Sequence, residues 1–123
     1  IGENELIGDF PSLVYGHGAA GFEIDRLDYR LGTPPHALLL ASSFGHGDEY
    51  QLAIEDQKAS GSPTGGDKNS LVRADMVYYE GPNDGAVFSV GSISWCGGLS
   101  HNDYDNNVSR ITENVLNRFS AGE

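Results

Sequence analysis

The chain has 123 residues, 38% of them hydrophobic, which is enough to bury the core of one ordinary domain but not of two. It carries 18 Asp and Glu against 7 Lys and Arg, and the net charge of −11 repels phosphate backbones and anionic lipid headgroups, so we expect no nucleic acid or membrane partner. With a single cysteine the chain cannot form an internal disulfide, which favours the cytoplasm. Because the first residue is Ile rather than Met, we expect residues 1–123 to be a single domain or the C-terminal part of a larger one.

The first pattern along the chain is a glycine-rich segment at residues 16–21, after the strand-like residues 12–15. It matches G-x-G-x-x-G, which binds a dinucleotide when a strand precedes it and a second parallel strand follows. Here the preceding strand is weak and the later elements look antiparallel. We therefore favour a plain glycine-rich turn, and a nucleotide-binding fragment remains a lesser alternative.

Two segments in the middle of the chain predict strands. Residues 37–43 form an apolar run after Thr33-Pro34-Pro35, where proline favours extended chain, so we expect a buried strand. Residues 50–55 alternate apolar with polar side chains, which is typical of a strand with one covered face. The stretch 58–70, rich in Ser, Gly, Asp and Lys, predicts an exposed internal loop.

A β-hairpin is the element that the sequence predicts most directly. Residues 72–80 and 86–92 are both rich in β-formers. The connection between them contains Asn83-Asp84-Gly85, residue types that tolerate positive φ in tight turns.

The chain is predicted to close with an amphipathic helix. Its apolar residues recur at helical spacing, and acidic and basic side chains stand near the expected N- and C-termini, where the helix dipole favours them. The apolar residues are Val108, Ile111, Val115 and Phe119, preceded by Asp103 and Asp105 and accompanied by Arg118. The fold class is therefore α+β or α/β, with antiparallel strands and a hairpin followed by a C-terminal helix.

Within the polar residues 102–107, Asp103, Asp105 and Asn107 alternate as in a calcium-binding loop that starts at Asp103. The sixth position of such a loop needs glycine for a sharp turn and the twelfth a glutamate, but Val108 and Asn114 stand there. We interpret the segment as a loop that caps the final helix.

Histidine and cysteine offer three further candidates. His46 precedes Asp48 by two residues, and His101 precedes Asp103 by the same spacing, which could supply a metal ligand or a general base. Nothing in the sequence joins the two pairs, so surface or structural hydrogen bonding is the favoured role. Cys96 could be a nucleophile, but the glycines after it favour a buried or partly buried packing role.

Glu23 and Asp25 follow the glycine-rich segment and precede Arg26. A carboxylate beside a glycine-rich loop could act on a water molecule as a general base. A structural ion pair of Glu23 and Asp25 with Arg26 is an equal alternative on composition.

Six blocks of the chain carry a family resemblance. They are residues 18–26, 32–36, 73–80, 85–96, 99–102 and 106–116. In this order they resemble successive blocks of the large (β) subunit family of N,N-dimethylformamidase, and the resemblance extends over most of the chain, from residue 18 to residue 116.

The resemblance implies hydrolysis of N,N-dimethylformamide to dimethylamine and formate. It implies a mononuclear iron held by two tyrosines and a glutamate, which we expect upstream of this chain, so no metal ligand is assigned here. It also implies that the chain ends a glutamine-amidotransferase-like α/β domain of a large subunit that works with a small subunit. The family's further active-site glutamate corresponds to Glu23. A non-catalytic β-rich binding or structural module is the alternative.

Overall fold

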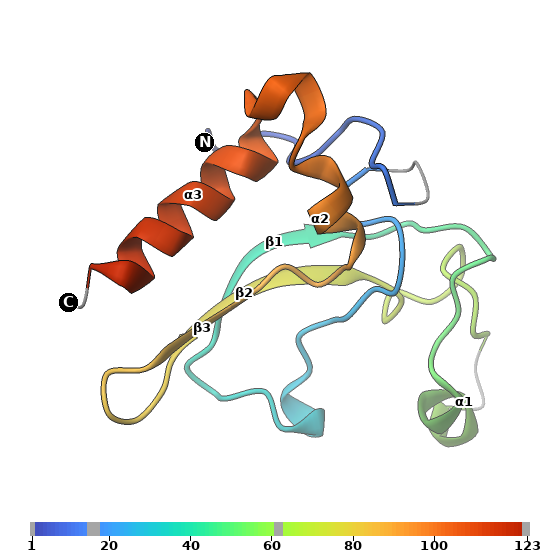
Figure 1. Ribbon diagram of the computed structural model, residues 1–123. Coiled ribbons are helices and arrows are strands. Elements are labelled where there is room, and N and C mark those ends of the chain that lie inside the picture. The colour runs from blue at the N-terminus through green and yellow to red at the C-terminus, as the bar shows by residue number, and fades with distance from the viewer. Residues whose placement is uncertain (1, 15–17, 61–62, 122–123) are drawn as a thin grey trace.

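Three antiparallel strands form a sheet in the order β1-β2-β3 (Figure 1). In the computed structural model, which describes residues 2–14, 18–60 and 63–121, β1 is Leu38–Ser43, β2 is Ala74–Glu80 and β3 is Ala86–Ser89. β2 is central and pairs with both neighbours, and the register with β1 shifts between Leu39 and Ala41. The expectation of antiparallel strands is confirmed.

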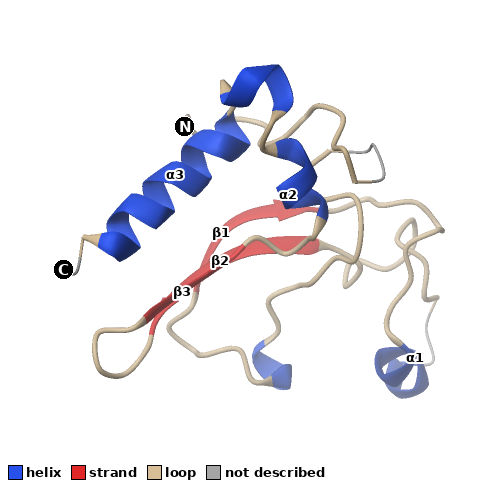
Figure 2. Ribbon diagram, in the orientation of Figure 1, coloured by secondary structure: helices blue, strands red, loops and turns tan. Residues whose placement is uncertain are grey.

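Helices lie mainly on one side of this sheet. Figure 2 shows α2 and α3 on the same side, with α1 far from α3 at the other end of the molecule. None of the described helices is both long and apolar enough to cross a membrane. The helical elements are η1 (Tyr29–Leu31), α1 (Ile54–Ser60), α2 (Ser94–Gly98), η2 (His101–Tyr104) and α3 (Asn107–Ser120).

The predicted hairpin is confirmed. The amide of Gly81 donates a hydrogen bond of 2.6 Å to the carbonyl oxygen of Gly85, which closes the connection between β2 and β3. Asn83 and Asp84 adopt φ of 61° and 59° at its tip. Both residue types tolerate this left-handed conformation, so the turn follows from local sequence.

The closing helix is also confirmed, together with its cap. The Asn106 side chain accepts a hydrogen bond of 2.9 Å from the amide of Ser109, which satisfies one free N–H group at the start of α3. Val108 is fully buried, and Ile111 is buried beside it. The buried core joins this face of α3 to Ala19, Met76 and Trp95.

The prediction of a strand at residues 50–55 is wrong. Gln51 forms only an isolated antiparallel bridge with Gly65, and α1 begins at Ile54. Leu52 is buried whereas Ile54 is exposed, so the alternating apolar side chains do not share a covered face. Helix α1 thus takes up the start of the segment predicted as a loop at 58–70, and Gly65 and Gly66 within that segment are buried.

The predicted strand at 37–43 forms, but the expectation that it is buried is wrong. Leu38, Leu39 and Leu40 are each slightly more than half exposed. The physical reason is position: β1 is an edge strand and pairs only with β2 among the described strands. The apolar run therefore lacks the cover that its composition predicts.

Candidate functional site

Glu23 is exposed and lies in an unusual backbone conformation. Its φ is +45°, a left-handed value that is uncommon for a residue other than glycine, Asn or Asp and often marks a functional site. Its side chain lines an open depression of about 380 Å³. The other lining residues are Asp25, Phe88, Ser89, Val90, Gly91, Ser92 and Ile93.

One hydroxyl bonds both backbone groups of Phe22, the residue before Glu23. Ser92 Oγ donates a hydrogen bond of 2.6 Å to the carbonyl oxygen of Phe22 and accepts one of 3.3 Å from the amide of Phe22. Ile24 forms an antiparallel bridge with Ser92. The backbone on both sides of Glu23 is therefore tied to the chain that leaves β3.

A close backbone approach fixes the next residues. The amide of Asp25 donates a hydrogen bond of 2.8 Å to the carbonyl oxygen of Gly91. The carbonyl oxygen of Asp25 accepts a hydrogen bond of 2.9 Å from the amide of Asp75 on β2. Gly91 has φ of +71°, and a Cβ there would lie 2.6 Å from the Asp75 carbonyl oxygen. Only glycine fits without a shift of the backbone.

The alternative in which Glu23 and Asp25 pair with Arg26 is wrong. Arg26 Nη2 lies 2.9 Å from Asp28 Oδ2 and 2.9 Å from Asp56 Oδ2 on α1. Within the described residues no ion pair involves Glu23 or Asp25. Both residues line the depression, and neither forms an ion pair with another described residue, which leaves Glu23 available for chemistry.

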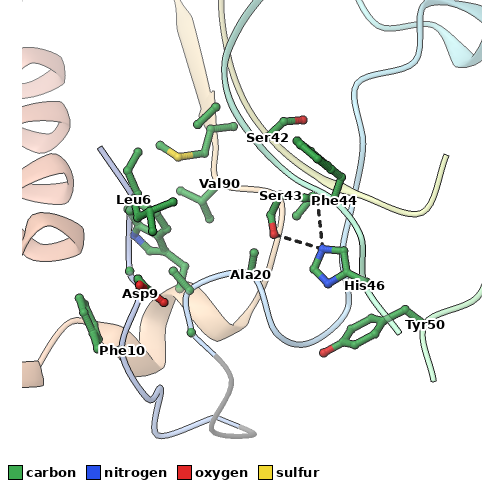
Figure 3. Close-up of a pocket in the computed structure, with 18 of the residues that line it drawn as sticks. Leu6, Asp9, Phe10, Ala20, Ser42, Ser43, Phe44, His46, Tyr50 and Val90 are labelled. Carbon is green, nitrogen blue, oxygen red and sulfur yellow. Dashed lines mark hydrogen bonds between the residues drawn. The ribbon is translucent and has the colours of Figure 1, made fainter. Parts of the chain in front are cut away.

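A larger open pocket of about 860 Å³ lies next to this segment (Figure 3). His46 points toward Ser43 there, and its Nε2 lies 3.2 Å from Ser43 Oγ and 3.1 Å from the Ser43 carbonyl oxygen. The Tyr50 ring is 4.9 Å from the His46 ring. Phe44 is largely exposed at the wall. His46 is thus a structural hydrogen bonder in this pocket, as its favoured interpretation predicts.

Residues 18–25 border both hollows, because Ala19 and Ala20 line the larger pocket and Glu23 lines the smaller one. The Tyr50 hydroxyl donates a hydrogen bond to the carbonyl oxygen of Gly21 between them. Burial, with a smaller contribution from Glu49, raises the pKa of Tyr50, so the phenol keeps the proton that it donates. The larger pocket is roomier and is also lined by exposed carboxylates, those of Glu5, Asp9 and Glu49. The candidate site is the smaller one, because Glu23, a non-glycine residue with a left-handed φ, lines it.

The second histidine pair forms no site with the first. The His101 ring stacks on Phe10 with ring centroids 4.0 Å apart, and Phe10 lines the larger pocket. Within the described part of the chain, no hydrogen bond or ring contact joins His101 to His46. Asp48, the expected partner of His46, instead hydrogen-bonds Asp67, which raises the pKa of Asp48.

The expected packing role of Cys96 is wrong. Cys96 is exposed on α2, a short helix that forms although it includes the glycines at 97 and 98. Its neighbour Trp95 takes the buried position instead. In a helix, adjacent side chains point in different directions, so burial of Trp95 turns Cys96 outward.

Metal and nucleotide chemistry find little support in these residues. In the described ranges, no group of three or more His, Cys, Asp or Glu side chains could hold a metal ion. The glycine-rich motif at 16–21 lies partly outside the described residues, since 15–17 are not described. The strands that follow it are antiparallel rather than parallel.

Sequence reasoning missed two residues that shape the candidate site, Ser92 and Tyr50. Ser92 stands 70 positions from Phe22, and Tyr50 stands 29 positions from Gly21. Neither residue belongs to a motif that points to such a contact. The only signal for Ser92 was its place in one of the blocks that carry the family resemblance.

Known proteins match the chain from end to end. The model of the family described as N,N-dimethylformamidase beta subunit-like, C-terminal, matches residues 2–106. An N,N-dimethylformamidase beta subunit from Alcaligenes sp. is 52% identical over 124 aligned residues, and one from Paracoccus aminophilus is 49% identical over 123. Each alignment covers 100% of this chain and 16% of the relative.

Proposed function

Because this chain belongs to the N,N-dimethylformamidase beta subunit-like family, we propose that the full-length protein hydrolyses the C–N bond of a small linear amide. N,N-Dimethylformamide, cleaved to dimethylamine and formate, is the substrate that we infer. Relatives about half identical over the whole chain are named for this amide, and their names support the choice.

We propose that Glu23 is the catalytic residue of this chain. The observation that carries the assignment is its geometry: an exposed carboxylate, held at φ of +45°, that lines a depression and takes part in no described ion pair. Strained conformations of this kind persist only where the surrounding structure enforces them. The family resemblance, which implies an active-site glutamate at Glu23, supports the assignment.

Glu23 would move a proton in the reaction. Its carboxylate accepts a proton from a water molecule whose oxygen adds to the formyl carbon. The protonated carboxyl then returns this proton to the amine nitrogen as the C–N bond breaks. The products are the formic acid or formate of the acyl part and the free amine, and Glu23 is regenerated as a carboxylate.

The resemblance also implies an iron held by two tyrosines and a glutamate. No described set of three or more His, Cys, Asp or Glu side chains is arranged to hold a metal. We propose that the iron ligands lie in other parts of the full-length protein. The relatives are about six times as long as this chain.

The rest of the enzyme is proposed as the partner of this chain. The three leucines of β1, together with Phe44, expose an apolar surface at the edge of the sheet. Apolar patches of this kind mark contact surfaces. We infer that the remainder of the large subunit packs there and that the chain completes a glutamine-amidotransferase-like α/β domain. We also propose that the enzyme contains a small subunit and is cytoplasmic.

Glu23→Gln in the complete enzyme tests the proposal, because it keeps the shape and removes the proton acceptor. We expect kcat to fall by about 10²-fold or more, with the iron content and the melting temperature unchanged. Glu55→Gln, an exposed carboxylate on α1, is the matched control and should keep wild-type turnover. Full activity of Glu23→Gln would remove Glu23 from the reaction and favour a non-catalytic module.

A further inference from the structure

The hydroxyl of Ser92 makes three hydrogen bonds, all of them to backbone groups. It donates a hydrogen bond of 2.6 Å to the carbonyl oxygen of Phe22 and accepts one of 3.3 Å from the Phe22 amide. It also accepts 3.3 Å from the amide of Ser94, at the start of α2. Ser92 is buried, so water does not replace these bonds when the hydroxyl is lost.

The shortest of these bonds, to the Phe22 carbonyl oxygen, acts on the peptide group that enters Glu23. The Phe22 carbonyl belongs to the peptide that links Phe22 to Glu23, and its orientation sets where the Glu23 side chain starts. On the far side of Glu23, the amide of Asp25 is held 2.8 Å from the Gly91 carbonyl oxygen. The left-handed φ of Glu23 is therefore enforced from both sides by Gly91 and Ser92.

We propose that Ser92 is a positioning residue for catalysis: its hydroxyl fixes the Phe22–Glu23 peptide and so aims the Glu23 carboxylate at the bound amide. This inference rests on the proposed function of Glu23. Without the hydroxyl, Glu23 can relax toward a negative φ, which most residues prefer, and its carboxylate moves away from the substrate. A displacement of about 1 Å can lower the rate of an enzyme by about 10²-fold.

Tyr50 holds the same segment one residue earlier and does not replace Ser92. Its hydroxyl donates a hydrogen bond to the carbonyl oxygen of Gly21, which belongs to the Gly21–Phe22 peptide and not to the Phe22–Glu23 peptide. The predicted defect of a Ser92 variant is thus a misdirected carboxylate in an otherwise folded protein.

The test uses the complete enzyme with N,N-dimethylformamide as the substrate. Ser92→Ala should lower kcat by about tenfold or more and leave KM within about twofold, because the lost interaction aligns the proton acceptor rather than binding the amide. In the Glu23→Gln background, Ser92→Ala should cause no further loss of kcat, since a residue that acts through Glu23 has nothing left to position. Equal losses in both backgrounds would overturn the proposal.

Ser12→Ala is the matched control. Ser12 is a buried serine whose hydroxyl also bonds two backbone groups, the carbonyl oxygen of Ser94 at 2.8 Å and the amide of Val14 at 3.1 Å. Its loss should lower the melting temperature as much as that of Ser92 and keep kcat at the wild-type value. The same loss of kcat in both variants would overturn the positioning role.

Two further outcomes separate the proposals. If Ser92→Ala does not accumulate in folded form, Ser92→Cys keeps the volume and weakens the hydrogen bonds, so kcat should fall there too. Wild-type kcat in folded Ser92→Cys or Ser92→Ala overturns the positioning role alone, provided that Glu23→Gln is impaired. Full activity of Glu23→Gln contradicts the catalytic role of Glu23 itself.

Discussion

Trp95 Nε1 donates a hydrogen bond of 3.0 Å to Thr112 Oγ1, which joins α2 to α3 inside the core. Trp95 is buried, and Thr112 Oγ1 in turn donates 2.8 Å to the carbonyl oxygen of Val108. The indole N–H group has a single hydrogen to donate, so its satisfaction depends on this one oxygen.

Thr112→Val is therefore expected to destabilise the chain by about 1–3 kcal/mol, because it leaves a buried donor without an acceptor at nearly constant volume. Urea unfolding followed by the fluorescence of Trp95, the single tryptophan, measures the loss. Thr112→Ser keeps the oxygen and should lose much less. Equal midpoints for Thr112→Val and the wild type would show that the bond contributes nothing.

Asp28 makes the stability depend on pH. Hydrogen bonds from Arg30 and from Arg26 hold the pKa of the buried Asp28 carboxyl well below its usual range. The folded-state pKa is thus lower than the unfolded-state value of about 4, so stability is present above pH 4 and is lost as the pH falls toward the folded-state pKa.

Asp28→Asn should therefore be less stable than the wild type at pH 7, and the difference should shrink between about pH 4 and pH 2. Urea midpoints at several pH values check this. Asp84→Asn at the hairpin tip leaves the Asp28 contacts intact and should follow the wild-type curve. A constant gap between Asp28→Asn and wild type would show that the arginines do not act through the charge of Asp28.

Cys96 should react in the folded chain. Its side chain is exposed on α2, so a thiol-specific chromogenic reagent should modify one thiol per chain without denaturant. The far-UV circular dichroism should not change on modification, because no packing contact is lost. Cys96→Ser is the blank. Reaction only after unfolding would mean that Cys96 is covered.

The exposed leucines of β1 should matter more to the complete enzyme than to this chain alone. Leu39 is 53% exposed here, so Leu39→Ser should change the stability of the isolated chain by about 0.5 kcal/mol or less. If the remainder of the large subunit packs on β1, the same substitution should destabilise the full-length subunit by about 1–3 kcal/mol, measured by thermal unfolding of both proteins. An equally small effect in both would place that contact elsewhere.

Local chemistry was sufficient for the hairpin and for the start of α3. Asn83 and Asp84 tolerate the positive φ that a tight connection needs, and Asn106 caps α3 by accepting a hydrogen bond from the amide three residues ahead of it. In both cases every interacting group lies within a few residues along the chain. The amino-acid sequence therefore determined these elements by itself.

The family could also be predicted, because blocks of residues in a fixed order identify a family even when no single motif does. The catalytic role of Glu23 stays a prediction. The alternating pattern at residues 50–55 led to a wrong strand prediction, since a period of two predicts a strand only where another part of the fold covers one face of it. The same limit applies to β1, whose leucines are not covered by any of the residues that the structure describes.

Only the tertiary structure decided how Glu23 is held and what Arg26 binds. Ser92 contacts Phe22 across 70 positions, and Arg26 selects Asp28 and the distant Asp56 over the adjacent Asp25. From the sequence alone, every carboxylate near an arginine along the chain is a similarly good candidate for its ion-pair partner. Which pair forms, and which backbone bond holds a left-handed glutamate in place, depends on packing between segments that the order of residues does not bring together.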